Sequence, residues 1–192
     1  GACWGVVPAK AWPILLGHYP QAEQWRPVLA TVLSLGMLAL WVFSPARLRT
    51  PAWLAAGLVW GPVCILLMRG GLGTLTLVPS QDWGGLPLTL LLFFVSWWLS
   101  VPLAMLWALG RYHGGWVGRL CTALIELVRG VPLITLLFAT VFVLPLLLPA
   151  EHTPPMVLRA GLALVLFSAA YLAEILRGGL QTVAIEQSEA GK

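Results

Sequence analysis

Charged residues are scarce in this chain, and their spacing limits what it can fold into. Eleven Lys/Arg and seven Asp/Glu account for 9% of the 192 residues, whereas soluble domains carry about 25%. Between these charges lie uncharged stretches at residues 27–46, 50–68, 83–110 and 130–150. Each reaches or exceeds, within one residue, the roughly 20 apolar residues that a helix needs to cross a bilayer. The spacing therefore predicts an all-α, polytopic membrane protein.

A fifth uncharged stretch, residues 160–173, is shorter than the others. Arg159 and Glu174 lie at its ends, where long side chains can reach the membrane interface. We therefore expect five spanning helices, at roughly residues 28–44, 52–68, 86–109, 124–148 and 157–177. Pro102, Pro132 and Pro145 fall within these windows, and each removes a helix hydrogen bond and permits a kink.

Composition narrows the class of protein further. The chain is 59% apolar with a mean hydropathy of +0.89, so it has too little polar surface for a soluble enzyme, a nucleic-acid-binding module or a disordered protein. The basic residues are mostly isolated, without a cluster that could bind nucleic acid. They are commoner in the loops 45–51 and 110–123 and in the C-terminal tail, which places these segments in the cytoplasm.

The sequence offers no set of residues for catalysis or for a cofactor. The three histidines lie far apart, and no HExxH, GxSxG or P-loop motif is present. The three cysteines, at positions 3, 64 and 121, form no CxxC pair. We expect neither an enzyme nor a metal or cofactor site.

Two segments place ionisable groups at the ends of spans in the same order. Glu126 is followed at i+3 by Arg129, and Glu174 by Arg177, a spacing that puts both charges on one helix face. The expected topology brings both pairs to the cytoplasmic side at a similar depth, so pairing between helices is possible as well. Such charges mark function more often than surface charges do, but pairs that only fix helix packing are an equal alternative.

Glycines follow both arginines. Gly130 leads through Val131 to Pro132, and Gly178 leads to a second glycine. These positions fit a turn, a close helix approach or a chain that leaves the membrane for a loop. The tail after residue 180 is too polar to insert.

Four segments together resemble one known family. Residues 124–134 are similar to the E-x-x-R-G-x-P-L segment, and residues 168–181 to the A-Y-x-x-E-x-x-R-G-G segment, of polar amino-acid permeases from bacterial ATP-binding-cassette (ABC) importers. Residues 187–191 resemble the start of the Q-x-E-A-A coupling loop, and residues 82–90 the entry to the first core helix. The order of the segments is that of the family.

The resemblance implies a type I ABC importer permease fold in two parts. Residues 82–192 would form the permease core, cut off within the coupling loop. Residues 1–81, with two further spans, resemble the extension of the long permease subunits of general L-amino-acid importers. Gly191 stands where the motif has its second alanine, and Glu186 where the family usually has glycine.

The resemblance also implies a function and a set of partners. The protein would form the translocation path for amino acids in the bacterial inner membrane, beside a second permease subunit, an ABC ATPase that hydrolyses ATP, and a periplasmic amino-acid-binding protein. The implied ATPase-coupling residues are Gln187, Glu189, Ala190 and Gly191. The implied motif at the membrane ends comprises Glu126, Arg129, Gly130, Pro132, Glu174, Arg177 and Gly178. The competing hypothesis is a membrane scaffold that organises partners without transporting.

Overall fold

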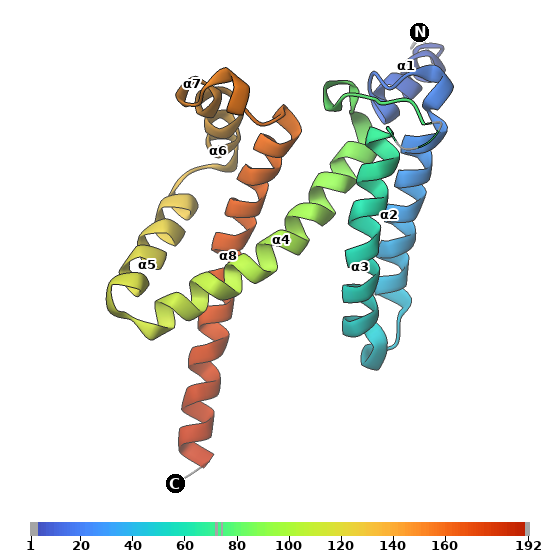
Figure 1. The fold of residues 1–192 in the computed structure, drawn as a ribbon. Helices are drawn as coiled ribbons and strands as arrows, with labels where there is room; N and C mark the ends of the chain where they lie inside the picture. Colours follow the sequence, from blue (N-terminus) through green and yellow to red (C-terminus); the bar gives the residue numbers. More distant parts are fainter. Residues whose placement is uncertain (1–3, 72, 74, 191–192) are drawn as a thin grey trace. The chain divides into compact units, whose positions relative to one another are not determined.

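The computed structural model describes residues 4–71, 73 and 75–190, and its description excludes the side chains of residues 8–9, 46–55, 58 and 181–190. The described chain is helical, and its one β-bridge joins Gly17 to Trp83. The elements, in order (Figure 1), are α1 (Val6–Leu16), η1 (Gln21–Glu23), α2 (Trp25–Phe43), α3 (Ala46–Arg69), η2 (Ser80–Asp82), α4 (Gly85–His113), α5 (Gly115–Gly130), α6 (Leu133–Phe138), η3 (Ala139–Val143), α7 (Leu144–Leu147), η4 (Ala150–His152) and α8 (Met156–Ala190). The all-α class is confirmed.

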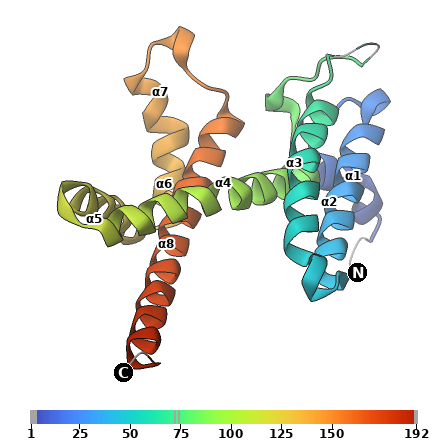
Figure 2. The same ribbon diagram turned by 60° about the horizontal axis from the view of Figure 1, so that its bottom comes forward.

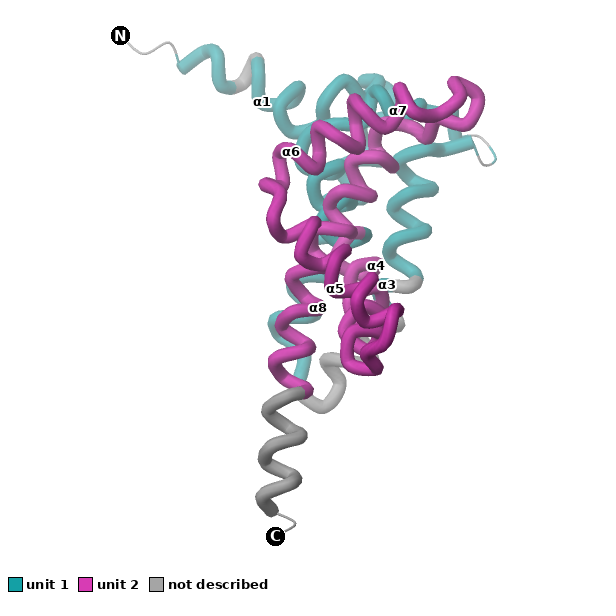
Figure 3. Tube along the Cα trace, turned by 90° about the vertical axis from the view of Figure 1, so that its left-hand side faces the viewer, with its two compact units in different colours: residues 1–95 teal, residues 96–192 magenta. Residues whose placement is uncertain are grey.

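The chain divides into two compact units, residues 1–95 and 96–192, coloured separately in Figure 3. The long helix α4 begins in the first unit and ends in the second. The boundary at residues 81 and 82, inferred from the family resemblance, stays a prediction.

Among the described residues, three segments are long and apolar enough to cross a membrane: Gln21–Phe43, Gly85–His113 and Met156–Leu180. They contain the expected spans 86–109 and 157–177, and all but the last residue of the expected span 28–44. The expected span 52–68 lies within α3, whose described apolar part is the shorter segment Val59–Arg69.

The fourth expected span is wrong as one continuous helix. The chain bends by 104° between Gly115–Gly130 and Leu133–Leu147. Pro132 causes the break because it cannot donate a backbone hydrogen bond and disfavours a helical conformation at the residue before it. Val131 is accordingly extended, with φ −105° and ψ 131°. The pair counts as a fourth span only if both halves are taken together.

In the first unit, α2 and α3 form an antiparallel pair that lies side by side in both views (Figures 1 and 2). Pro45 ends α2 by holding Ser44 in an extended conformation. Between the helices, the Trp60 Nε1 donates to Ser34 Oγ at 3.2 Å, and Ser34 Oγ donates to the Ala30 carbonyl at 2.7 Å. The polar atoms of both side chains are thereby satisfied within an apolar pair.

Arg26, which the sequence places among loop charges, is fully buried at the start of α2. Its Nε donates to the Leu67 carbonyl at 2.7 Å and its Nη1 to the Thr76 carbonyl at 2.9 Å. Glu23 supplies the opposite charge at 3.5 Å. Arg26 therefore ties α2 to the end of α3 and to the loop after it.

In the second unit, small residues allow three helices to pack closely. Ala104 and Ala108 of α4 and Ile125 and Val128 of α5 form one buried cluster with three alanines of α8. The α8 members are Ala169, Ala170 and Ala173. Small side chains let helix backbones approach closely in a membrane, and this core sets the position of the charges next to it.

Candidate functional site

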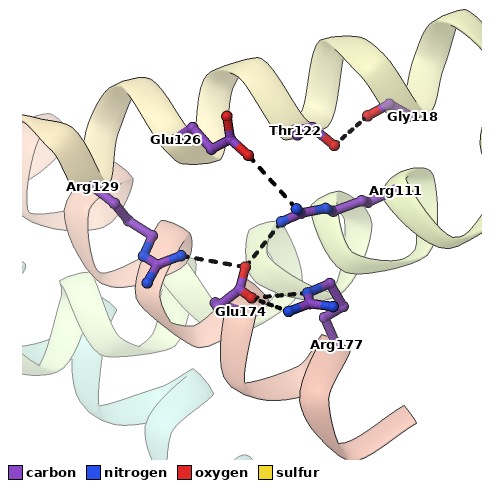
Figure 4. Close-up of polar contacts among 7 residues, drawn as sticks. All are labelled: Arg111, Gly118, Thr122, Glu126, Arg129, Glu174 and Arg177. Carbon is purple, nitrogen blue, oxygen red and sulfur yellow. Dashed lines mark hydrogen bonds and ion pairs between the residues drawn. The ribbon is translucent and has the colours of Figure 1, made fainter. Parts of the chain in front are cut away.

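Glu174 of α8 is the centre of an ion-pair cluster in the second unit (Figure 4). One helical turn away, Arg177 donates to Glu174 Oε1 through Nε at 2.8 Å and also through Nη2. This is the pair that the i, i+3 spacing predicts.

The other carboxylate oxygen of Glu174 binds arginines from two further helices. Arg111, at the end of α4, donates from Nη1 to Glu174 Oε2 at 2.9 Å. The Arg129 Nη1, near the end of α5, lies 3.3 Å from the same oxygen. One carboxylate thus joins the ends of α4 and α5 to α8.

Glu126 and Arg129 contact residues of other helices instead of forming the expected pair with each other on one helix face. The Glu126 Oε1 lies 3.7 Å from Arg111 Nη2, and its side chain is 65% exposed. Arg129 reaches across to Glu174, and its guanidinium lies 5.5 Å from the centre of the Tyr171 ring. Both partners of Arg129 come from α8 because Ile125 and Val128 pack α5 against that helix.

A tight turn between α4 and α5 brings Arg111 to the cluster. Gly114 and Gly115 have φ of 72° and 66°, a backbone conformation that glycine adopts without steric cost. A Cβ at Gly110 would lie 2.7 Å from Cys121 Sγ, and one at Gly118 would lie 3.3 Å from the Gly110 carbonyl oxygen. The two helices can therefore start their antiparallel course in direct contact only because these positions lack side chains.

The cluster contains three guanidinium groups and two carboxylates, a formal excess of one positive charge. The side chains of Glu174 and Arg111 are about one-quarter exposed, and those of Arg129 and Arg177 about one-third. A network that shares one carboxylate stabilises helix ends more than separate surface pairs do. The ion pairs of the cluster can hold three helices together or can exchange partners when the helices move.

The remaining predicted motif residues lie outside the cluster. Gly130 and Pro132 flank the break after α5. Gly178 lies within α8, which continues past it, so the expected turn or loop at this glycine is wrong. A Cβ at Gly130 or Gly178 would meet nothing within 4 Å, so neither marks a close approach of helices.

The side chains of the predicted coupling residues lie outside the described part of the chain. The side chains of Gln187, Glu189 and Ala190 are not described, and neither is any part of Gly191. Within the described ranges, no group of three or more His, Cys, Asp or Glu could hold a metal ion.

Sequence reasoning missed Arg111 as a member of the site. It was interpreted only as a loop charge that orients α4. The available signal was its place at the end of a span on the same side as both Glu-x-x-Arg pairs. Tyr171 belongs to a recognised motif, but its contact with Arg129 requires knowledge of how α5 packs on α8.

Comparison with known proteins adds an independent observation. Residues 100–192 match the family described as "Binding-protein-dependent transport system inner membrane component". The chain is 38% identical over its whole length to the inner membrane amino-acid ABC transporter permease protein YhdY of Escherichia coli, of which it covers 53%. It is 31% identical, over 99% of its length, to BztC of Rhodobacter capsulatus, a glutamate/glutamine/aspartate/asparagine transport system permease protein, of which it covers 57%.

A third relative matches over a shorter part of the chain. Over 56% of the chain, it is 37% identical to the probable amino-acid ABC transporter permease protein y4tG of Sinorhizobium fredii, and covers 46% of that protein. The chain thus spans about half the length of the curated relatives it matches. No solved structure matches it.

Proposed function

We infer, from the match of residues 100–192 to the family described as "Binding-protein-dependent transport system inner membrane component", that the whole protein is the permease subunit of an ATP-driven amino-acid importer. It would form part of the translocation path and would couple to an ATPase through the cytoplasmic segment at residues 187–191. The membrane would be the bacterial inner membrane, where the relatives' names place such permeases.

The observation that carries the proposal is the cluster at Glu174. It lies inside the family segment and connects α8 to α4 and α5 through Arg111, Arg129 and Arg177. Because α8 leads from this cluster toward the coupling residues, a force applied there would reach all three helices. A two-state change of this kind is how alternating access is driven by a partner.

The substrates proposed are polar L-amino acids. BztC is named for glutamate, glutamine, aspartate and asparagine, and YhdY for amino acids in general. The partners proposed are an ABC ATPase, a second permease subunit and a periplasmic amino-acid-binding protein. ATP hydrolysis would take place in the ATPase.

Uptake of a labelled amino acid into membrane vesicles tests this function. Vesicles containing the full-length protein and its partners should accumulate labelled L-glutamine when ATP is supplied, and vesicles without the ATPase should not. A membrane scaffold would assemble with the same partners but give equal glutamine uptake with and without the ATPase. That result would contradict the proposal.

A further inference from the structure

Arg159 is an arginine inside a membrane-spanning segment that the ion-pair cluster does not use. It is the fourth residue of the span Met156–Leu180, far along α8 from Glu174. Its Nη1 donates a hydrogen bond to the backbone carbonyl of Val141. The guanidinium is therefore directed at the backbone of the neighbouring broken span.

The sequence explains why the Val141 carbonyl accepts this bond. In an α-helix it would receive the N–H of residue 145, which here is a proline and has none. The chain forms a π-helical turn, η3 (Ala139–Val143), at this place. Such turns are rare and occur frequently at functional sites. Arg159 thus meets a span whose regular hydrogen bonding is interrupted.

The bond to Val141 leaves the charge of Arg159 without an opposite charge. Its Nε is buried and has no hydrogen-bond partner. No acidic side chain of the described residues pairs with it, and none of them accepts from its Nη2. By contrast, Arg111, Arg129 and Arg177 each bind a carboxylate. A charged group within a span is costly and by default indicates a functional site.

The Nε–Nη2 edge of the guanidinium, whose Nε is buried without a hydrogen-bond partner, has the geometry that binds a carboxylate. The Nε and Nη2 donors point in parallel from one edge, which matches the two oxygens of a carboxylate group. A neutral donor would serve the Val141 carbonyl equally well, so that hydrogen bond alone gives no reason for an arginine. An anion that pairs with this edge supplies the reason.

We propose that Arg159, held against the π-helical turn by Val141, binds the α-carboxylate of the transported amino acid. The site rests on the proposed function, because it assigns a residue to the substrate of that transport. Discontinuous membrane-spanning helices commonly form the substrate sites of transporters.

Two variants separate a substrate role from a structural one. Arg159→Gln keeps an N–H donor for the Val141 carbonyl but removes the positive charge, whereas Arg159→Lys keeps the charge. Arg119→Gln, at an exposed arginine of α5, is the matched control. The full-length permease with its partner subunits is purified in lipid nanodiscs, and the binding of L-glutamine and of L-glutaminamide, which lacks the carboxylate, is measured.

The wild type and Arg119→Gln should bind L-glutamine and discriminate against L-glutaminamide. Arg159→Gln should bind L-glutamine about tenfold or more weakly, as expected for a lost charge-assisted hydrogen bond, and Arg159→Lys should lose less. ATP-dependent uptake should fall in the same order. Equal binding of L-glutamine and L-glutaminamide by the wild type would overturn the site. This measurement does not depend on the folding of any variant.

Three further outcomes are decisive. Unchanged glutamine binding and uptake in Arg159→Gln would contradict the carboxylate site but leave the proposed function intact. Loss of a co-purified anionic phospholipid from Arg159→Gln, with glutamine affinity unchanged, would assign the arginine to a lipid phosphate and overturn the proposal. Absence of any glutamine uptake by the wild type would contradict the proposed function and the site together.

Discussion

Glu174 is one carboxylate that serves three guanidinium groups, so its loss affects three helices at once. In Glu174→Gln the side chain keeps its size, but the three arginines face one another without the negative charge between them. We expect the free energy of unfolding to fall by about 1–3 kcal/mol and ATP-dependent uptake to be lost. Thermal unfolding of the purified full-length protein and vesicle uptake measure the two effects.

Glu126→Gln is the matched control for this substitution. Glu126 contacts Arg111 at 3.7 Å, but its side chain is 65% exposed, and exposed ion pairs contribute little. We expect its free energy of unfolding to change by no more than about 0.5 kcal/mol. Equal Tm values for the two variants would show that Glu174 is not the centre of the network.

Tyr19 gives the first unit a dependence on alkaline pH. Its hydroxyl donates to the Met68 carbonyl at 2.9 Å, and burial raises the pKa of Tyr19 above its ordinary value, although the charge of Arg26 opposes this. Because the unfolded chain loses the tyrosine proton first, the contribution of Tyr19 to stability is complete below about pH 10 and decreases as pH rises through the folded-state pKa.

Tyr19→Phe should remove this part of the pH dependence. The variant should be less stable than the wild type near neutral pH by about 0.5–1.5 kcal/mol, since it lacks the hydrogen bond to Met68. The difference should shrink as pH rises from about 10 through the raised folded-state pKa of Tyr19. Tm values recorded across this range for both proteins would contradict the assignment if they fell in parallel.

At the scale of elements, the contact between α4 and α5 depends on a missing side chain. A Cβ at Gly110 would lie 2.7 Å from the Sγ of buried Cys121. We expect Gly110→Ala to lower the free energy of unfolding by about 1–3 kcal/mol, the usual effect of overpacking. It should also weaken the cluster, because Arg111 is the next residue in the chain. Thermal unfolding measures the stability change.

Removing the sulfur should restore the space. Cys121→Ala deletes the atom that the new Cβ meets, so the double variant Gly110→Ala/Cys121→Ala should be more stable than the sum of the two single changes predicts, by about 0.5–3 kcal/mol. Gly130→Ala is the control, since a Cβ there meets nothing within 4 Å. Additive effects of Gly110→Ala and Cys121→Ala would contradict the contact.

The expected helix positions are confirmed where they depend on composition and are wrong where a single residue interrupts the helix. Charge spacing locates α2, α4 and α8 because a span requires a long uncharged stretch. The same reasoning joins α5 to α6 because a hydropathy window does not register that Pro132 interrupts backbone hydrogen bonding. The available signal was Pro132, two residues after Gly130. A kink within one helix, as the sequence analysis expects there, is a smaller change than the 104° break.

The sequence predicts the local pair of the cluster and leaves pairing between the two Glu-x-x-Arg segments open, as in the contact of Arg129 with Glu174. The pairing of Glu174 with Arg177 follows from the helical repeat. The pairing of Arg111 with Glu174, 63 residues away, depends on the turn at Gly114 and Gly115 and on the alanine-lined packing of α8. The sequence gives the number of residues between such partners, but it does not give the angle at which their helices pack.

At the scale of the whole molecule, α8 connects three features of the proposed transport. Arg159 lies near its start, Glu174 near its middle, and the expected coupling residues at its end and just beyond. A helix of 35 residues is about 50 Å long. A continuous helix transmits displacement along its axis, so substrate binding, helix pairing and ATPase contact would be linked by one element rather than by separate loops.

The predicted coupling role of Ala190 is tested by the variant Ala190→Arg in the full-length protein. By the family resemblance, this alanine belongs to the segment that contacts the ATPase, where a large charged side chain would obstruct docking. We expect ATP hydrolysis to continue while glutamine uptake by vesicles falls at least about tenfold, a loss of about 1.4 kcal/mol in effective coupling. Ala190→Ser, which adds only a hydroxyl, should retain most of the uptake. Normal uptake by Ala190→Arg would place the coupling contact elsewhere, whereas equal loss in both variants would indicate that the segment tolerates no side chain larger than alanine.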